Sequence, residues 1–138
     1  MMETIKIYEV SKRPTTNTSA EVYKLMKDIK DNEQELMMLL CLDSRNRVIS
    51  RNIITIGGLN SSIVHPREIF RTAIMNNANT IILVHNHPSG LSEPSPDDIE
   101  VTQMLVKASK IIGIDILDHV IVGHDNYTSM NEKELVDF

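Results

Sequence analysis

Two histidines separated by a single residue are the strongest chemical signal in this sequence. His85 and His87 follow the apolar run TIILV, which predicts a buried strand. Side chains at positions i and i+2 of a strand point to the same face, and their Cα atoms lie roughly 6.5–7 Å apart. Two imidazoles at this separation can bind one metal ion. The pair therefore predicts a metal site at the end of a strand.

A carboxylate beyond the next loop could supply a third ligand. Asp98 follows His87 after a loop of proline, serine and glycine residues and a helix start at Ser95 and Pro96. Two histidines and one carboxylate leave the fourth corner of a tetrahedral zinc site open to water, which distinguishes catalytic from structural zinc. An ion held in this way lowers the pKa of its water toward about 7 and polarises a carbonyl. These residue types therefore indicate hydrolytic chemistry.

A hydrolytic site also needs a base that accepts a proton from water. Glu35 stands where the polar segment DNEQE meets the apolar run LMMLLCL, so its carboxylate is either functional or at the solvated end of a strand. Glu33 is an alternative that spacing alone does not exclude. Ser95 could donate a hydrogen bond to the oxyanion that develops on an attacked carbonyl. Because Ser95 and Asp98 also fit a capping box, both could instead serve the helix start alone.

The elements around these residues predict an α/β domain with a mixed sheet. A hairpin is expected first, its leading strand buried on both faces, and strands then alternate irregularly with helices. We expect residues 1–18 to form an N-terminal strand and linker, and residues 19–138 to form a single domain. The expected strands are residues 4–8, 35–43, 47–56, 80–84, 115–122 and 127–130. The expected helices are one capped by Ser19 that ends near residue 29, one from residue 66 to about 77, and one capped by Ser95 that ends near residue 113.

The motifs resemble a known signature when they are taken together. A glutamate at the head of a strand, His85-x-His87, seven residues and then Ser95-x-x-Asp98 are similar to the JAMM (MPN+) metalloprotease motif. The segments ANTIILVHNHPSG, PSPDD and GIDILDHVIVG resemble the C-terminal domain of RadC-type proteins. The resemblance covers roughly residues 31–132, most of the chain.

This resemblance implies a fold, a chemistry and a set of roles. The fold is a three-layer α-β-α sandwich around a mixed sheet, similar to that of cytidine deaminases. His85, His87 and Asp98 match the Zn²⁺ ligands of the family, Glu35 its general acid/base and Ser95 its oxyanion helper. A zinc-dependent peptidase or isopeptidase acting on a peptide or protein is therefore expected. Deaminase chemistry is not, because zinc deaminases use H-x-E followed by P-C-x-x-C, and neither is present.

The composition limits the alternatives. A formal net charge of −5 disfavours binding to a nucleic-acid backbone, and aromatic residues make up 4% with no tryptophan, too few for a base-stacking platform. A single cysteine, Cys41, excludes an internal disulfide framework, so a reducing, cytoplasmic location is expected. Since no apolar run approaches about 20 residues, no membrane span is expected.

Two other functions stay open at this point. Longer RadC proteins carry an N-terminal helix-hairpin-helix region associated with DNA, and the residues before Asp31 are too few for it, so we expect a DNA-repair-associated role to be weaker here. A non-catalytic zinc-binding scaffold is the other alternative, although a scaffold has no need of Glu35. His119, next to Asp118 in an otherwise apolar strand, is expected to be a hydrogen-bonded structural residue or a partner of a metal ligand.

Overall fold

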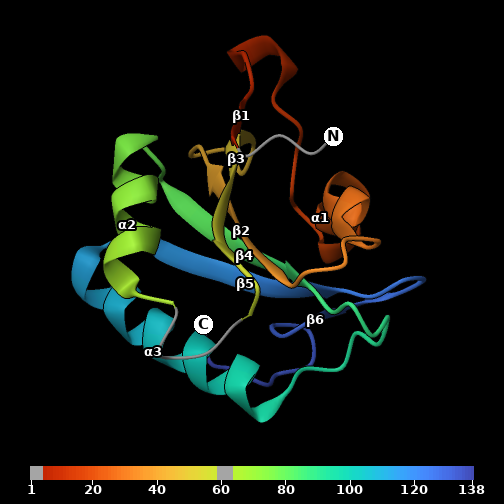
Figure 1. Cartoon of the computed structure of the whole chain (residues 1–138). Helices are drawn as coiled ribbons and strands as arrows, with labels where there is room; N and C mark the ends of the chain where they lie inside the picture. Colours follow the sequence, from red (N-terminus) through yellow and green to blue (C-terminus); the bar gives the residue numbers. More distant parts are fainter. Residues whose placement is uncertain (1–4, 59–63) are drawn as a thin grey trace.

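The computed structural model describes residues 5–58 and 64–138, which form a six-stranded mixed sheet with helices on both faces (Figure 1). This confirms the expected α/β class and the α-β-α arrangement. Within the described residues, no helix combines the length and apolar character needed to cross a bilayer. Thr4, the first residue of the expected N-terminal strand, lies outside the described residues.

The sheet has the order β1-β3-β2-β4-β5-β6. Strands β4 and β5 run parallel, and the other neighbouring strands run antiparallel. The chain crosses from β4 to β5 through helix α3, because parallel neighbours need a long connection. The strands are β1 (Ile5–Ile7), β2 (Leu36–Leu42), β3 (Val48–Ile56), β4 (Thr80–Asn86), β5 (Asp115–Val122) and β6 (Tyr127–Ser129).

Helix α1 covers one face of the sheet, and α2 and α3 cover the other (Figure 1). The helix expected to end near residue 29 is α1 followed by a short 3-10 helix, η2. Its cap is Thr18 rather than Ser19, because the Thr18 hydroxyl accepts a hydrogen bond from the Glu21 N–H at 3.2 Å and Ser19 is already helical. The helices are η1 (Val10–Lys12), α1 (Ser19–Met26), η2 (Lys27–Ile29), α2 (Pro66–Met75) and α3 (Pro96–Ile112).

The pleat of β2 divides the core into two parts. Every residue of this strand is buried, as expected for a strand covered on both faces. Met37, Leu39 and Cys41 pack in the cluster under α2 and α3, whereas Met38 and Leu40 pack in the cluster under α1. Alternate side chains of one strand thus fill both cores.

The same alternation in β4 positions the residues of interest. Ile81 and Leu83 face α2 and α3, and His85 is the next residue on that face. Val84 faces α1, and Asn86 is the next residue on that opposite face. Consecutive residues at the end of one strand therefore serve different sides of the sheet.

The N-terminal segment is attached to the edge of the sheet. β1 pairs with β3, and the Val48 N–H donates a hydrogen bond to the Pro14 carbonyl at 2.8 Å. The Thr16 hydroxyl donates to the Asn46 carbonyl at 2.9 Å. These bonds join the segment to the β2–β3 hairpin, and the expected domain boundary at residue 19 stays a prediction.

Asp43 closes the turn between β2 and β3. Its carboxylate accepts hydrogen bonds from the N–H groups of Arg45 and Arg47 at 2.9 and 3.0 Å. The guanidinium groups of Arg47 and Arg13 donate to it at 2.9 and 3.2 Å. Burial alone would raise the pKa of Asp43, but these hydrogen bonds outweigh burial and hold that pKa below its usual value. The ionised carboxylate therefore stabilises the hairpin.

We expect Asp43→Ala to lower the free energy of unfolding at pH 7 by about 1–3 kcal/mol, because the donors around the turn lose their acceptor. With a folded-state pKa below the unfolded value of about 3.9, the carboxylate stabilises the fold above that pH. This contribution is lost as the pH falls through the folded-state pKa, so the difference from the wild type should close in acid. Urea titrations at several pH values measure this difference in the free energy of unfolding. Asp125→Ala, in the exposed turn between β5 and β6, is the control, and an equal loss there would contradict the assignment.

Candidate metal centre

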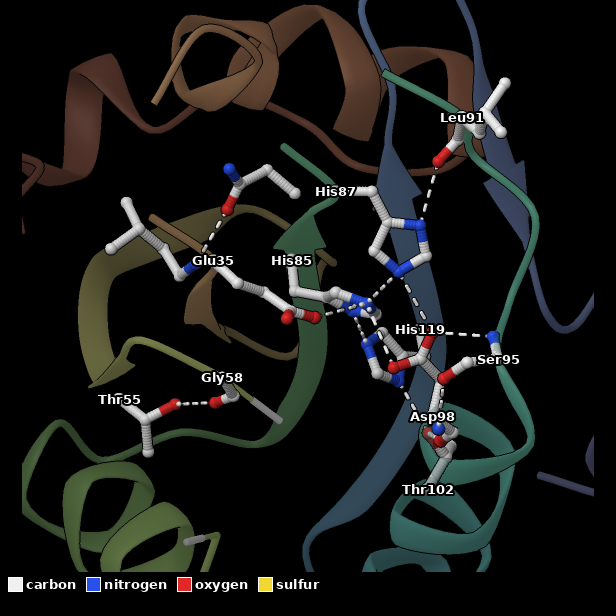
Figure 2. A network of polar contacts seen from close by, with 12 residues as sticks. Glu35, Thr55, Gly58, His85, His87, Leu91, Ser95, Asp98, Thr102 and His119 are labelled. Atoms are coloured by element: carbon white, nitrogen blue, oxygen red, sulfur yellow. Dashed lines mark hydrogen bonds and ion pairs between the residues drawn. The ribbon is translucent and has the colours of Figure 1, made fainter. Parts of the chain in front are cut away.

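Four titratable side chains meet at one end of the sheet (Figure 2). Glu35, His85, His87 and Asp98 each offer one ligand atom, and these atoms all lie within 4.8 Å of one another. The Nε2 atoms of His85 and His87 lie 3.0 Å apart. Asp98 Oδ1 lies 3.4 Å from His85 Nε2, and Asp98 Oδ2 lies 3.0 Å from His87 Nε2. The three residues expected to bind metal and the residue expected to act as base are thus brought together, and their roles stay predictions.

Different elements supply these side chains. Glu35 immediately precedes β2, His85 lies in β4, His87 follows β4, and Asp98 lies in the first turn of α3. The His85 side chain is fully buried and that of Asp98 is 2% exposed, whereas those of His87 and Glu35 are 15% and 25% exposed. The cluster therefore has a closed end inside the fold and an open end beside Glu35.

The start of α3 holds Asp98 in place. The Ser95 hydroxyl accepts a hydrogen bond from the Asp98 N–H at 3.1 Å, and Asp98 Oδ2 accepts one from the Ser95 N–H at 2.8 Å. This is the capping box expected from the sequence. Since the Ser95 oxygen acts here as an acceptor, its hydroxyl hydrogen is not used by the cap. The cap and the oxyanion role expected for Ser95 are therefore compatible.

Asp98 remains ionised in this setting. Burial would raise the pKa of its carboxyl group, but contacts with His85 and His87 and the Ser95 N–H outweigh burial and hold that pKa well below its usual range. In turn, the Asp98 carboxylate raises the pKa of His87. The carboxylate therefore favours positive charge at the centre of the cluster.

A buried hydrogen-bond chain fixes the tautomer of His85. The Thr102 hydroxyl donates to the Asp98 main-chain carbonyl at 2.7 Å, so its oxygen accepts from His119 Nδ1–H at 2.6 Å. Burial and the neighbouring His85 hold the pKa of His119 well below its usual range, so this ring is neutral and its Nε2 can only accept. His85 Nδ1–H donates to that atom at 2.6 Å. His85 Nε2 is left with a lone pair that faces the cluster.

The loop after β4 fixes the tautomer of His87 in the same way. His87 Nδ1 lies 2.8 Å from the Leu91 carbonyl, which can only accept, so Nδ1 carries the hydrogen (Figure 2). His87 Nε2 lies 3.0 Å from Asp98 Oδ2 and can donate a proton to it, and a divalent cation that displaces this proton would meet a lone pair there. Two imidazole nitrogens and an ionised carboxylate converge on one point, which is the donor set of a divalent metal site. The residues fit such an ion.

His119 was expected either as a structural residue or as a partner of a metal ligand, and its hydrogen bond with His85 is the contact that a ligand partner would make. Two other contributors, Thr102 and the Leu91 carbonyl, were not predicted from the sequence. Thr102 lies four residues after Asp98 on α3, a spacing that places both on one helical face and could have indicated it. The Leu91 carbonyl is a main-chain group, for which the sequence offers no side-chain signal.

The comparison with known families agrees with this geometry. A family model described as "RadC-like JAB domain" matches residues 16–135. The chain belongs to the RadC-like JAB domain family. This confirms the resemblance found in the sequence and agrees with the mixed-sheet fold.

Relatives that match this RadC-like domain are longer proteins. A UPF0758 protein of Desulforamulus reducens is 49% identical over 112 residues, which are 81% of this chain and 49% of that protein. A UPF0758 protein of Methanosarcina barkeri is 43% identical over 117 residues, 84% of this chain and 51% of the relative. One of Clostridium perfringens is 45% identical over 139 residues, 99% of this chain and 61% of the relative. The chain spans about half to three-fifths of the length of these relatives.

Removing one ligand should remove the metal. The protein is purified without added metal and then dialysed against zinc, and we expect it to bind one ion per chain. We expect His85→Ala to lose the ion, because the two remaining donors do not form a three-ligand site. Inductively coupled plasma mass spectrometry after dialysis measures the content. His65→Ala, at the start of α2 and outside the cluster, is the matched control. Equal metal content in the two variants would exclude this centre.

The hydrogen-bond chain behind His85 should also affect metal affinity. We expect Thr102→Val to weaken zinc binding about 10-fold, because loss of a group that orients a ligand typically costs 10–100-fold. Thr72→Val is the control, since the Thr72 hydroxyl also donates to the carbonyl four residues earlier in its helix but, in the part of the chain that the structure describes, forms no hydrogen bond with a histidine. Competition with a fluorescent chelator measures both affinities. Equal affinities for both variants would show that the chain does not act on the ligand.

Proposed function

We propose that this protein is a zinc-dependent hydrolase of amide bonds, a peptidase or isopeptidase acting on a peptide or protein. One observation carries the proposal: His85, His87 and Asp98 converge as a ligand set beside a more exposed carboxylate, Glu35. The Glu35 Oε1 atom lies 3.6 Å from His85 Nε2. A carboxylate in this position can exchange protons with water next to the ion.

Zinc is the metal that this donor set favours. Imidazole nitrogen and carboxylate oxygen are both zinc ligands, and three protein ligands are typical of catalytic zinc sites. Bound at these residues, the ion would lower the pKa of water and polarise the substrate carbonyl. The open side of the cluster, at Glu35 and His87, is where water and substrate can enter.

Two side chains supply the remaining chemistry. Glu35 accepts a proton from water while the oxygen of that water bonds to the carbonyl carbon. Glu35 then returns the proton to the amine as the C–N bond breaks. The Ser95 hydroxyl, whose hydrogen is not used in the helix cap, donates to the developing oxyanion.

Two competing functions have less support than the hydrolase from the same observations. A DNA-repair-associated role is opposed by the formal net charge of −5. A non-catalytic zinc scaffold needs the three ligands but gives no reason for a carboxylate 3.6 Å from a ligand nitrogen. The chain matches only 49% to 61% of the length of its relatives. The substrate and partners of a whole protein of that length are therefore part of this proposal as well.

The role of Glu35 is tested by Glu35→Gln. We expect one zinc per chain to be retained and amide hydrolysis to fall at least about 100-fold, because the amide cannot accept the proton. Glu33→Gln is the matched control: it removes an exposed carboxylate two residues away and should leave the rate unchanged. Rates over a panel of peptide and isopeptide substrates, with metal content determined on the same samples, measure both. Full activity of Glu35→Gln would reject this base.

A wild-type protein that binds zinc but cleaves nothing in the panel would favour the scaffold. Affinity for duplex DNA that falls steeply with rising salt would favour the DNA-associated role, because neutralised phosphates release counterions. Either result would overturn the proposal.

A further inference from the structure

Asn86 lies between the two histidines in sequence but points to the other side of the sheet. It is completely buried, and its side chain makes three hydrogen bonds. Oδ1 accepts from the Leu36 N–H at 2.7 Å, and Nδ2 donates to the carbonyls of Gln34 and Asn32 at 3.0 and 3.3 Å. The oxygen and both amide hydrogens are therefore used.

These partners lie on both sides of Glu35. The bonds to Gln34 and Leu36 hold the peptide groups immediately before and after it. The Glu35 carbonyl itself also accepts a hydrogen bond, from the Gly57 N–H at 2.8 Å. The backbone of Glu35 is therefore fixed from β4 on one side and from the end of β3 on the other.

The side chain of Glu35 depends on this backbone support. Within residues 5–58 and 64–138, its carboxylate forms no hydrogen bond with another side chain, and it approaches His85 Nε2 to 3.6 Å. The position of its Cα therefore limits where the carboxylate can lie relative to the histidine nitrogens. A shift of about 1 Å at a reacting group can cost about 100-fold in rate.

Asparagine suits this position better than aspartate or leucine, which are similar in size. The register of β2 against β4 runs from Leu42 opposite Thr80 to Met37 opposite His85. At Leu36 the pairing with β4 has ended, although Leu36 still pairs with Ile56 of β3, and the Asn86 side chain bonds the Leu36 amide and the preceding carbonyls in place of β4 main-chain groups. Aspartate would present an acceptor to the carbonyls of Gln34 and Asn32, and leucine would offer neither donor nor acceptor.

We propose that Asn86 is a positioning residue that fixes Glu35 relative to the metal-binding histidines. Because Asn86 is covalently joined to His85 and His87, one strand end sets both the ligands and the carboxylate that works beside them. This role rests on the proposed function of Glu35 as the base. It predicts an effect on Glu35 that is separate from metal binding and from general stability.

The first test does not depend on activity. Amide hydrogen exchange of the full chain, followed by NMR, should show Leu36 and Gly57 exchanging about tenfold faster in Asn86→Ala than in the wild type, since each loses a bond or its support. The amides of Leu39 and Leu40, inside β2, should keep their protection. Unchanged protection at Leu36 and Gly57 would overturn the proposal whether or not the protein is a hydrolase.

The second test separates positioning from a merely structural role. We expect Asn86→Ala to lower kcat about 10–100-fold with KM and zinc affinity unchanged, and to cause no further loss in a Glu35→Gln background. Asn52→Ala is the matched control: Asn52 is 3% exposed in β3 and bonds to Ser50 and Cys41, away from Glu35. An equal loss of kcat in this control, or an additive loss with Glu35→Gln, would overturn the proposal.

A further variant covers the case in which Asn86→Ala does not fold. Asn86→Asp keeps an acceptor for the Leu36 N–H but removes the donors to Gln34 and Asn32, so kcat should fall while the Leu36 amide stays protected. Wild-type kcat in this variant would contradict the proposal. If the wild type itself shows no hydrolysis, the proposed function fails, and the exchange experiment still decides whether Asn86 holds this segment.

Discussion

The close approach of two imidazole nitrogens is the constraint on which the rest of this site depends. His85 Nε2 and His87 Nε2 face each other at 3.0 Å, and an ionised carboxylate lies beside them. These atoms would repel one another unless a proton or a metal cation lay between them, so the fold places a demand for positive charge at this point. The main-chain carbonyls of Leu91 and Asp98 orient the two rings through hydrogen bonds, the second by way of Thr102 and His119. The arrangement is one that a divalent cation relieves.

The pleat of a single strand organises the polar groups around this centre. Alternation in β4 sends His85 toward α3 and Asn86 toward the segment before β2. Because β5 runs parallel to β4, His119 meets His85 from the neighbouring strand. A candidate metal site and the hydrogen bonds on both sides of Glu35 therefore arise from consecutive residues of one strand end.

Features of local origin could be predicted from the sequence. The buried strands, the capping box at Ser95 and the shared face of the two histidines follow from short-range patterns, and they are present. The choice between Thr18 and Ser19 as a cap could not be made, because adjacent hydroxyl residues satisfy the same rule. The contact of His119 with His85 depends on how β5 aligns with β4, and the bonds of Asn86 depend on where β2 leaves the ladder. Neither the alignment of β5 with β4 nor the end of the β2 pairing can be read from a local sequence pattern.

Asp98 belongs both to the first turn of α3 and to the ligand cluster, so helix formation and ion capture share one carboxylate. By thermodynamic linkage, a cation bound to this carboxylate would also stabilise the first turn of α3. A well-formed first turn would in the same way raise the affinity for the cation. A divalent cation bound at this cluster would therefore make this corner of the fold more resistant to unfolding, and its removal would loosen the end of the helix.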